Sequence, residues 1–114
     1  MSECLFCKMA AGEIKPDIVY EDADVLAFRD INPQAPTHVL VIPKTHIATL
    51  NDLQSEHAPL IGKLFLAAQQ IAALDGIAQG GYRTVLNCNR DAGQTVFHIH
   101  LHVLGGRPMH WPPG

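Results

Sequence analysis

Histidine and aliphatic residues alternate strictly along Val96-Phe97-His98-Ile99-His100-Leu101-His102-Val103-Leu104. Successive side chains of a β-strand point to opposite faces, so the three imidazoles would share one face. The aliphatic residues between and after them would share the other face and pack into a core. We therefore expect a strand over 96–104 with one face buried in the core and the other facing a site.

The segments around this strand predict one α+β domain over residues 1–114. Further strands are expected where short β-branched and apolar runs lie between turn residues, at 18–20, 25–28, 38–42 and 82–87. Helices are expected where apolar residues recur at helical spacing, at 4–11 and, after an N-cap at Ser55, up to about Leu74. A turn is expected at 89–93. A short helix, three strands, a long helix and two strands are typical of an α+β fold with a largely antiparallel sheet of about five strands.

Composition and charge exclude several classes of partner. The net charge is −3 with only 8 Lys and Arg residues, so nucleic acid is not expected as a partner, because that affinity scales with the phosphates neutralised. A membrane is not expected either, since the chain has no polybasic tract and no run of about 18 apolar residues. The N-terminus is not typical of a signal peptide. Three cysteines, an odd number, favour a reducing compartment, so we expect a cytoplasmic protein.

The histidine row has three interpretations. It could be the polar face of a half-buried strand. It could be a three-histidine zinc site, but alternate side chains stand about 6.6 Å apart on a strand, and zinc needs each nitrogen at about 2.0–2.1 Å. It could perform nucleophilic and acid–base chemistry, because neutral and protonated imidazoles coexist near neutral pH. We favour the last interpretation, with no catalytic metal, because residues 91–95 offer N–H groups and a hydroxyl to a phosphate.

Three segments resemble the histidine triad (HIT) superfamily and, within it, the Hint branch of purine nucleoside phosphoramidases. They are the histidine row with Gly93-Gln94-Thr95 before it, the segment Phe28–His38, and the ending Gly105–Gly114. The resemblance implies a HIT-like fold that assembles as a homodimer with a ten-stranded sheet. It also implies hydrolysis of the P–N bond of adenosine 5′-phosphoramidates to AMP and an amine, through a nucleotidyl-histidine intermediate.

The resemblance assigns a role to each of four histidines. His100 would be the nucleophile, and His102 would contact the phosphate and help to protonate the leaving amine. His38 would support the triad, and His98 would orient or buffer it. Asp30 would hold the ribose, because a carboxylate can accept hydrogen bonds from both ribose hydroxyls.

The resemblance also implies a pocket for a purine nucleoside monophosphate or phosphoramidate. Its residues would be Leu5, Phe6, Met9, Phe28, Asp30, Ile31, Asn87, Gly93, Gln94, Thr95, Val96, His100, His102 and Trp111. The apolar ones would form the purine slot, although such residues usually just pack a core. Thr95 stands where this branch often has serine and keeps the hydroxyl. Trp111 would reach toward the partner's site in the homodimer.

Cys4 and Cys7 have the spacing of metal ligands. A thioredoxin-like redox motif would follow a strand, and too few residues precede Cys4 for one. Some members of the superfamily complete such a pair with two histidines, which here correspond to His46 and His98. Four protein ligands leave no open position, so the resemblance implies a structural zinc ion. The alternative is a pair of reduced thiols packed as small hydrophobic groups. No role is expected for Cys88, His57 or His110.

Two other functions remain open at this point. One is hydrolysis of dinucleoside polyphosphates, as in the Fhit branch of the superfamily. The Gly-Gly-Arg-Pro ending at 105–108 and the segment 33–38 favour the phosphoramidase instead. The other is a nucleotide-binding adaptor with incidental catalysis. The complete histidine row argues against it, because binding alone needs no imidazole directed at phosphorus.

Overall fold

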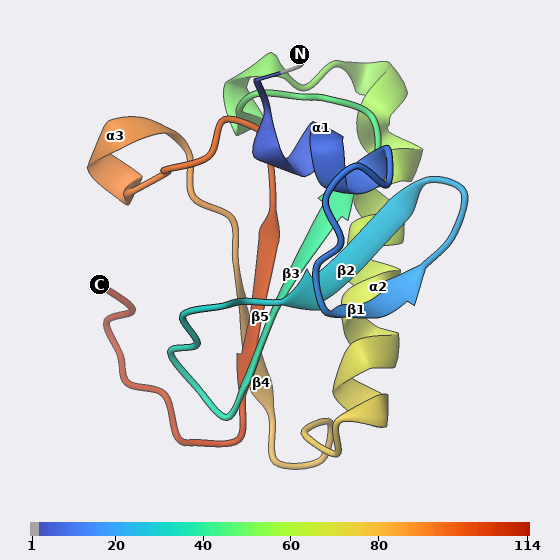
Figure 1. The fold of residues 1–114 in the computed structure, drawn as a ribbon. Coiled ribbons are helices and arrows are strands. Elements are labelled where there is room, and N and C mark those ends of the chain that lie inside the picture. The colour runs from blue at the N-terminus through green and yellow to red at the C-terminus, as the bar shows by residue number, and fades with distance from the viewer. Residues whose placement is uncertain (1–2) are drawn as a thin grey trace.

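The computed structural model describes residues 3–114 and contains one five-stranded sheet (Figure 1). All neighbouring strands are antiparallel, in the order β1-β2-β3-β5-β4. The strands are β1 (Ile18–Glu21), β2 (Val25–Arg29), β3 (Thr37–Pro43), β4 (Tyr82–Val85) and β5 (Leu101–Gly105). The helices are α1 (Leu5–Ala10), α2 (Ala58–Leu74) and α3 (Asn89–Ala92), with 3-10 turns at Leu50–Asp52 and Ser55–His57. The expected α+β fold with one long helix is confirmed.

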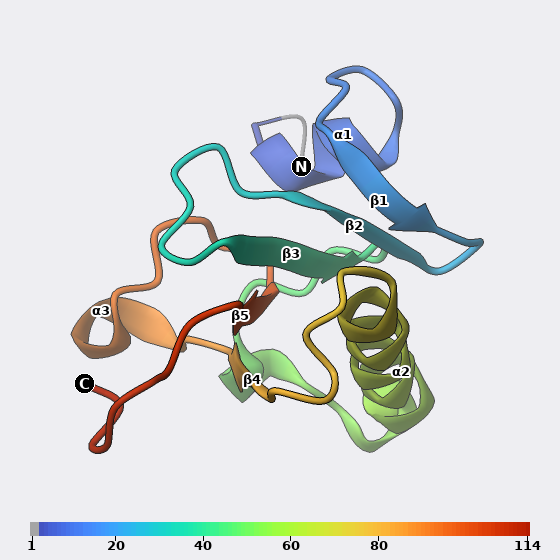
Figure 2. The same ribbon diagram turned by 90° about the horizontal axis from the view of Figure 1, so that it is seen from below.

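The two faces of the sheet are covered by different helices (Figure 2). On one face, Ile99, Leu101 and Val103 pack with residues of α2 in the larger core cluster. On the other face, Phe6 of α1 packs with Phe28 and neighbouring strand residues in a smaller cluster. The alternation in the histidine row therefore separates the α2 side of the sheet from the α1 side. Within residues 3–114, no helix is both long and apolar enough to cross a membrane.

The strand expected over 96–104 begins only at Leu101, which corrects the sequence-based boundary. Its partner β3 ends at Pro43, where the chain turns away. The Ile99 N–H bonds instead to the Ile47 carbonyl at 2.8 Å, and Ile99 is still fully buried. The ladder stops at the pair Val41–Leu101, although β3 itself continues to Pro43, and the burial pattern continues beyond the ladder.

Two other expectations at element ends were wrong. Ser55 is not the N-cap of the long helix, because 55–57 form a separate 3-10 turn and α2 begins at Ala58. The ring of His57 accepts a hydrogen bond from the Gln54 N–H at 2.9 Å across that turn. Residues 89–92 form the short helix α3 rather than a plain turn, and Gly93 closes it with a φ of 85°. That left-handed conformation favours glycine.

An ion pair fixes the end of α2 to the sheet. Arg29 at the end of β2 donates two hydrogen bonds to the Asp75 carboxylate, one of them at 2.9 Å. The Thr37 hydroxyl of β3 donates a third, also at 2.9 Å. The hydrogen bonds hold the pKa of Asp75 below its ordinary value, and those from Arg29 have the largest effect. Asp75 thus joins α2 to two central strands.

Candidate active site

A cavity of about 540 Å³ lies on the α1 side of the sheet. Its walls come from α1, the segment that follows it, β2, β3 and the histidine row. The lining residues are Leu5, Phe6, Met9, Ile14, Lys15, Pro16, Phe28, Arg29, Asp30, Ile31, Leu40, Thr95, Val96, His100 and His102. The cavity therefore combines an apolar lining with two imidazoles and a carboxylate, and we call it the main cavity.

Backbone groups fix the tautomer of the buried His38. The Gln34 N–H lies 3.0 Å from His38 Nδ1, so this nitrogen accepts and the ring proton sits on Nε2. His38 Nε2 then donates to His102 Nδ1 at 2.9 Å. His102 must therefore carry its own proton on Nε2. His102, which lines the cavity, therefore presents its Nε2–H as a hydrogen-bond donor.

His100 has the opposite tautomer. Its Nδ1 lies 2.8 Å from the carbonyl oxygen of His98, which can only accept, so the ring proton is on Nδ1. Nε2 of His100 is left with a free lone pair. The rings of His100 and His102 have centroids 5.0 Å apart. A nucleophilic nitrogen and an N–H donor thus stand side by side in one wall.

Burial keeps the imidazoles of His102 and His38 neutral. Desolvation, aided by the neighbouring His100 and His38, lowers the pKa of His102 to about 4. Burial also lowers the pKa of His38, although the nearby Asp30 carboxylate opposes this shift. Asp30 Oδ2 lies 3.4 Å from His38 Nε2. His102 and His38 are therefore uncharged near neutral pH, so neither puts a positive charge beside the His100 lone pair.

Phe6 holds the histidine row against α1. Its ring meets that of His100 edge-on with centroids 5.2 Å apart and that of His98 at 5.9 Å. It also contacts Phe28 of β2 at 5.5 Å, and only 3% of its surface is exposed. Although Phe6 lines the cavity, most of its surface is committed to packing.

Ten of the fourteen residues implied for the nucleotide line this cavity. The ones that do not are Asn87, Gly93, Gln94 and Trp111. The Gln94 amide is used by the loop itself, since it accepts from the Asn89 N–H and donates to the Ala48 and Val96 carbonyls. The Trp111 side chain is 82% exposed.

Sequence reasoning missed five lining residues, Ile14, Lys15, Pro16, Arg29 and Leu40. Leu40 could have been found, because it alternates with His38 and Ile42 on one face of β3. The segment 14–16 gives no such signal, since it has no regular structure. It reaches the cavity only because the chain returns from α1 to β1.

Cys4, Cys7, His46 and His98 come together beside the cavity, with their ligand atoms all within 4.8 Å of one another. In a tetrahedral zinc site, two nitrogens lie about 3.3 Å apart and a nitrogen and a sulfur about 3.5 Å apart. Here the Nδ1 atoms of His46 and His98 are 3.3 Å apart. Cys4 and Cys7 sulfurs lie 3.4 and 3.6 Å from His98 Nδ1. The donor set and its spacing fit a metal ion.

His98 is oriented for such a role by the backbone. Its Nε2 lies 2.7 Å from the Pro43 carbonyl and therefore donates to it. This leaves the Nδ1 lone pair directed at the cysteines and His46. A hydrogen bond of this kind to the other ring nitrogen commonly orients histidine ligands.

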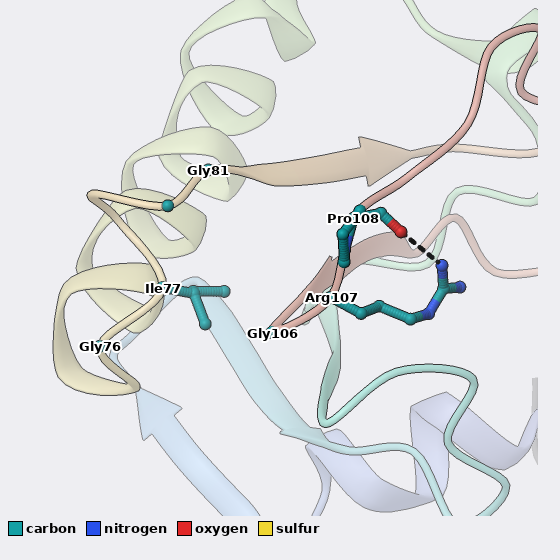
Figure 3. Close-up of a pocket in the computed structure, with 7 residues that line it drawn as sticks. Gly76, Ile77, Gly81, Gly106, Arg107 and Pro108 are labelled. Carbon is teal, nitrogen blue, oxygen red and sulfur yellow. Dashed lines mark hydrogen bonds between the residues drawn. The ribbon is translucent and has the colours of Figure 1, made fainter.

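A second concavity lies at the opposite end of β5 and has no such chemistry (Figure 3). It has a volume of about 380 Å³ and is lined mostly by glycines. Its one charged side chain, Arg107, donates to the carbonyls of Pro108 and Gln34 at 3.1 Å each. The fold and the site therefore define an α+β protein that holds paired imidazoles in the wall of a largely apolar cavity.

Comparison with known proteins places the chain in a family. The HIT domain family model matches residues 11–109. A purine nucleoside phosphoramidase of Escherichia coli K12 is 52% identical over 107 residues, or 94% of this chain and 90% of that protein. An uncharacterized HIT-like protein of Synechococcus elongatus is 54% identical, with 100% of both chains covered. The crystal structure of a HIT family hydrolase from Legionella pneumophila has a TM-score of 0.96 at 54% identity, covering 98% of this chain and 100% of that one. This chain belongs to the HIT domain family.

Proposed function

We propose that this protein is a hydrolase that cleaves the P–N bond of adenosine 5′-phosphoramidates to give AMP and an amine. The observation that carries the proposal is the pair of opposite tautomers, a free lone pair on His100 Nε2 beside an N–H on His102 Nε2. The phosphoramidase from E. coli, identical at 52% of aligned positions, supports the choice of bond.

In the first step, His100 Nε2 attacks phosphorus and the P–N bond breaks. The nitrogen leaves with the electron pair of that bond and must gain one proton to become an amine, which His102 hands over through Nε2–H. An anionic phosphate beside the ring favours its protonated form, so we expect His102 to be protonated in the substrate complex. Protonated His102 also carries a hydrogen on Nδ1, so the His38 Nε2–H then turns from His102 to the Asp30 carboxylate, which lies 3.4 Å away.

In the second step, water attacks the nucleotidyl-His100 intermediate. The N–P bond to His100 breaks, AMP is released, and the proton lost by the water replaces the one taken by the amine. Asp30 accepts hydrogen bonds from the ribose hydroxyls, and the apolar part of the cavity holds the purine. His38 is a positioning residue, because it acts only through His102.

The proposal includes a structural zinc ion held by Cys4, Cys7, His46 and His98, whose spacing fits a tetrahedral site. Zinc there supplies no catalytic chemistry, because four protein ligands leave no open position. It joins α1 to the segment before β5. All three cysteines are unpaired, which fits a reducing compartment, so the cytoplasm is the proposed location.

The proposal also includes a homodimer. Large apolar side chains of α2 are exposed, among them Phe65 at 48%, Leu66 at 59% and Leu74 at 75%. The strand β4 lies at an edge of the sheet and can pair with another strand. A second copy placed there would extend the sheet to ten strands and cover the apolar face. Trp111 would then reach toward the partner's cavity.

The activity is tested with adenosine 5′-phosphoramidate and the variant His100→Ala. We expect a loss of at least about 10²-fold in kcat, because the nucleophile is removed. The variant His57→Ala is the matched control, since this ring lies in the turn before α2, and it should keep its activity. Mass spectrometry of wild type, quenched by denaturation at alkaline pH where the P–N bond to imidazole survives, should show AMP attached to His100. Full activity of His100→Ala, or an adduct on another residue, would overturn the mechanism.

A further inference from the structure

A separate cavity of about 430 Å³ adjoins the main cavity and has no role in the chemistry above. It is lined by Glu3, Cys4, Leu5, His46, Thr95, Val96 and Phe97. Leu5, Thr95 and Val96 line both cavities. These three side chains therefore form the boundary between the two cavities. We call the second cavity the adjoining cavity.

The boundary between the two cavities contains Thr95, the residue whose hydroxyl we expect to meet the phosphate, and it lines the main cavity together with His100 and His102. Thr95 and Val96 come from the loop that leads into the histidine row. The substituent on the leaving nitrogen must extend away from phosphorus on the side opposite His100, because the nucleophile and the leaving group stand in line in a displacement at phosphorus. A chain on that nitrogen can pass over Leu5 and Val96 into the adjoining cavity.

The lining of the adjoining cavity indicates what such a chain should carry. Phe97 and Leu5 offer apolar surface, with 49% and 41% of their area exposed. Among the residues of the lining within 3–114, Glu3 carries the one carboxylate, and none is lysine or arginine. With the proposed zinc ion bound, the cysteine and histidine cluster would add no net charge, since two thiolates would balance a divalent ion. Glu3 therefore sets the sign of the cavity as negative.

We propose that the adjoining cavity is the subsite for the leaving amine, and that it selects alkyl amines bearing a second, cationic group at the far end. The inference rests on the proposed phosphoramidase activity. The alkyl stem contacts Leu5, Val96 and Phe97, and the distal ammonium faces the carboxylate of Glu3. The bonds broken and formed are those of the proposed phosphoramidase reaction. The substrates differ from the unsubstituted phosphoramidate only in the substituent on the leaving nitrogen.

The test compares three adenosine 5′-phosphoramidates with amines of nearly equal length: 4-aminobutyl, which is cationic, n-pentyl, which is neutral, and 3-carboxypropyl, which is anionic. We expect kcat/KM to fall in that order. An exposed charge pair is worth about a two- to fivefold difference between the cationic and neutral amines. The effect should appear in the burst of amine release, because all three substrates form the same nucleotidyl-enzyme.

Variants of the adjoining cavity assign the preference to residues. Glu3→Gln should abolish the preference for the cationic amine, and Glu3→Lys should reverse it toward the anionic amine. Phe97→Ala should lower kcat/KM for the pentyl amine by about threefold or more through lost apolar contact. Glu56→Gln is the matched control, because Glu56 is an exposed glutamate that lines a different cavity, and it should keep the wild-type order.

The reference substrate with an unsubstituted NH₂ group separates this inference from the function on which it rests. No hydrolysis of that substrate would refute the phosphoramidase itself. Hydrolysis of it with equal kcat/KM for the three amines would refute only the subsite. A preference that survives in Glu3→Lys would also refute it, since the charge would then come from elsewhere.

Discussion

At the scale of single residues, the site is set by which proton each imidazole carries. Each of three backbone groups fixes one ring: the Gln34 N–H fixes His38, the His98 carbonyl fixes His100, and the Pro43 carbonyl fixes His98. His102 then follows from His38. Backbone groups cannot change their donor or acceptor character, so this pattern of lone pairs is built into the fold.

The pKa of His102 leads to a prediction about pH. Burial with His100 and His38 lowers this pKa to about 4, with only Asp30 opposing. In a ¹⁵N NMR titration, His102 should stay neutral, with its proton on Nε2, from pH 7 to about 5. In His38→Ala, the fixed tautomer should be lost, and kcat should fall more than KM changes. Protonation of His102 near 6.5, the ordinary value, would contradict the assignment.

The same shift affects stability. The unfolded chain binds a proton at His102 near pH 6.5, but the folded chain binds one only near pH 4. Stability from this residue is therefore complete above about pH 6.5 and is lost as the pH falls toward 4. Chemical unfolding measured between these values should show the decline in the free energy of unfolding, and a replacement of His102 by phenylalanine should flatten it.

At the scale of elements, α1 has six residues and would not be stable alone. Phe6 fixes its buried side, and the Cys4, Cys7, His46 and His98 cluster fixes its beginning. The carbonyl of His98 also orients His100. The position of α1 and the orientation of His100 therefore both depend on His98.

Metal analysis tests the zinc ion at this scale. Purified protein should contain about one zinc per chain, and a strong chelator should lower Tm, because a bound metal stabilises the fold that holds it. Cys7→Ser should lower the zinc content and Tm in the same way. Cys88→Ser is the matched control, since Cys88 lies outside the cluster. Protein with little zinc and a Tm that a chelator does not change would refute the site.

At the scale of the whole molecule, exposed apolar surface on α2 lies beside a sheet whose last strand is unpaired on one side. Phe65, Leu66 and Leu74 are large apolar side chains exposed on this one helix, which is typical of a surface that another chain covers. Lys63 is the only charged residue between Ala58 and Leu74. A second copy of the chain would cover both the helix face and the strand edge.

Sedimentation should therefore show a homodimer at micromolar concentration. Leu66→Lys should shift the protein toward monomer, because it buries a charge in the expected interface. Leu50→Lys, a matched change of an exposed leucine outside α2, should leave the dimer intact. A monomeric wild type would refute the assembly, and loss of the dimer with both variants would show that α2 is not the specific contact.

Much of this architecture could be predicted because it depends on local pattern. The alternation at 96–104 correctly separated Ile99 and Leu101 from the imidazoles, and β-branched runs located β1 to β3 within a residue or two. Boundaries were less predictable. The strand at 96–104 lost its first residues because its ladder with β3 stops at Val41–Leu101 and the Ile99 N–H bonds to Ile47 instead, which is a fact about contacts between segments rather than about the strand itself.

The sequence by itself determined the order of the elements, the face of each strand and the residue types available for chemistry, because side-chain period and turn residues are local properties. Only the tertiary structure decided the tautomers of His100 and His102, the spacing of the possible metal ligands and the presence of Lys15 in the cavity wall. These depend on contacts between segments far apart in the chain. Their partners are largely backbone groups, which look alike at every position of a sequence and differ only in where the fold puts them.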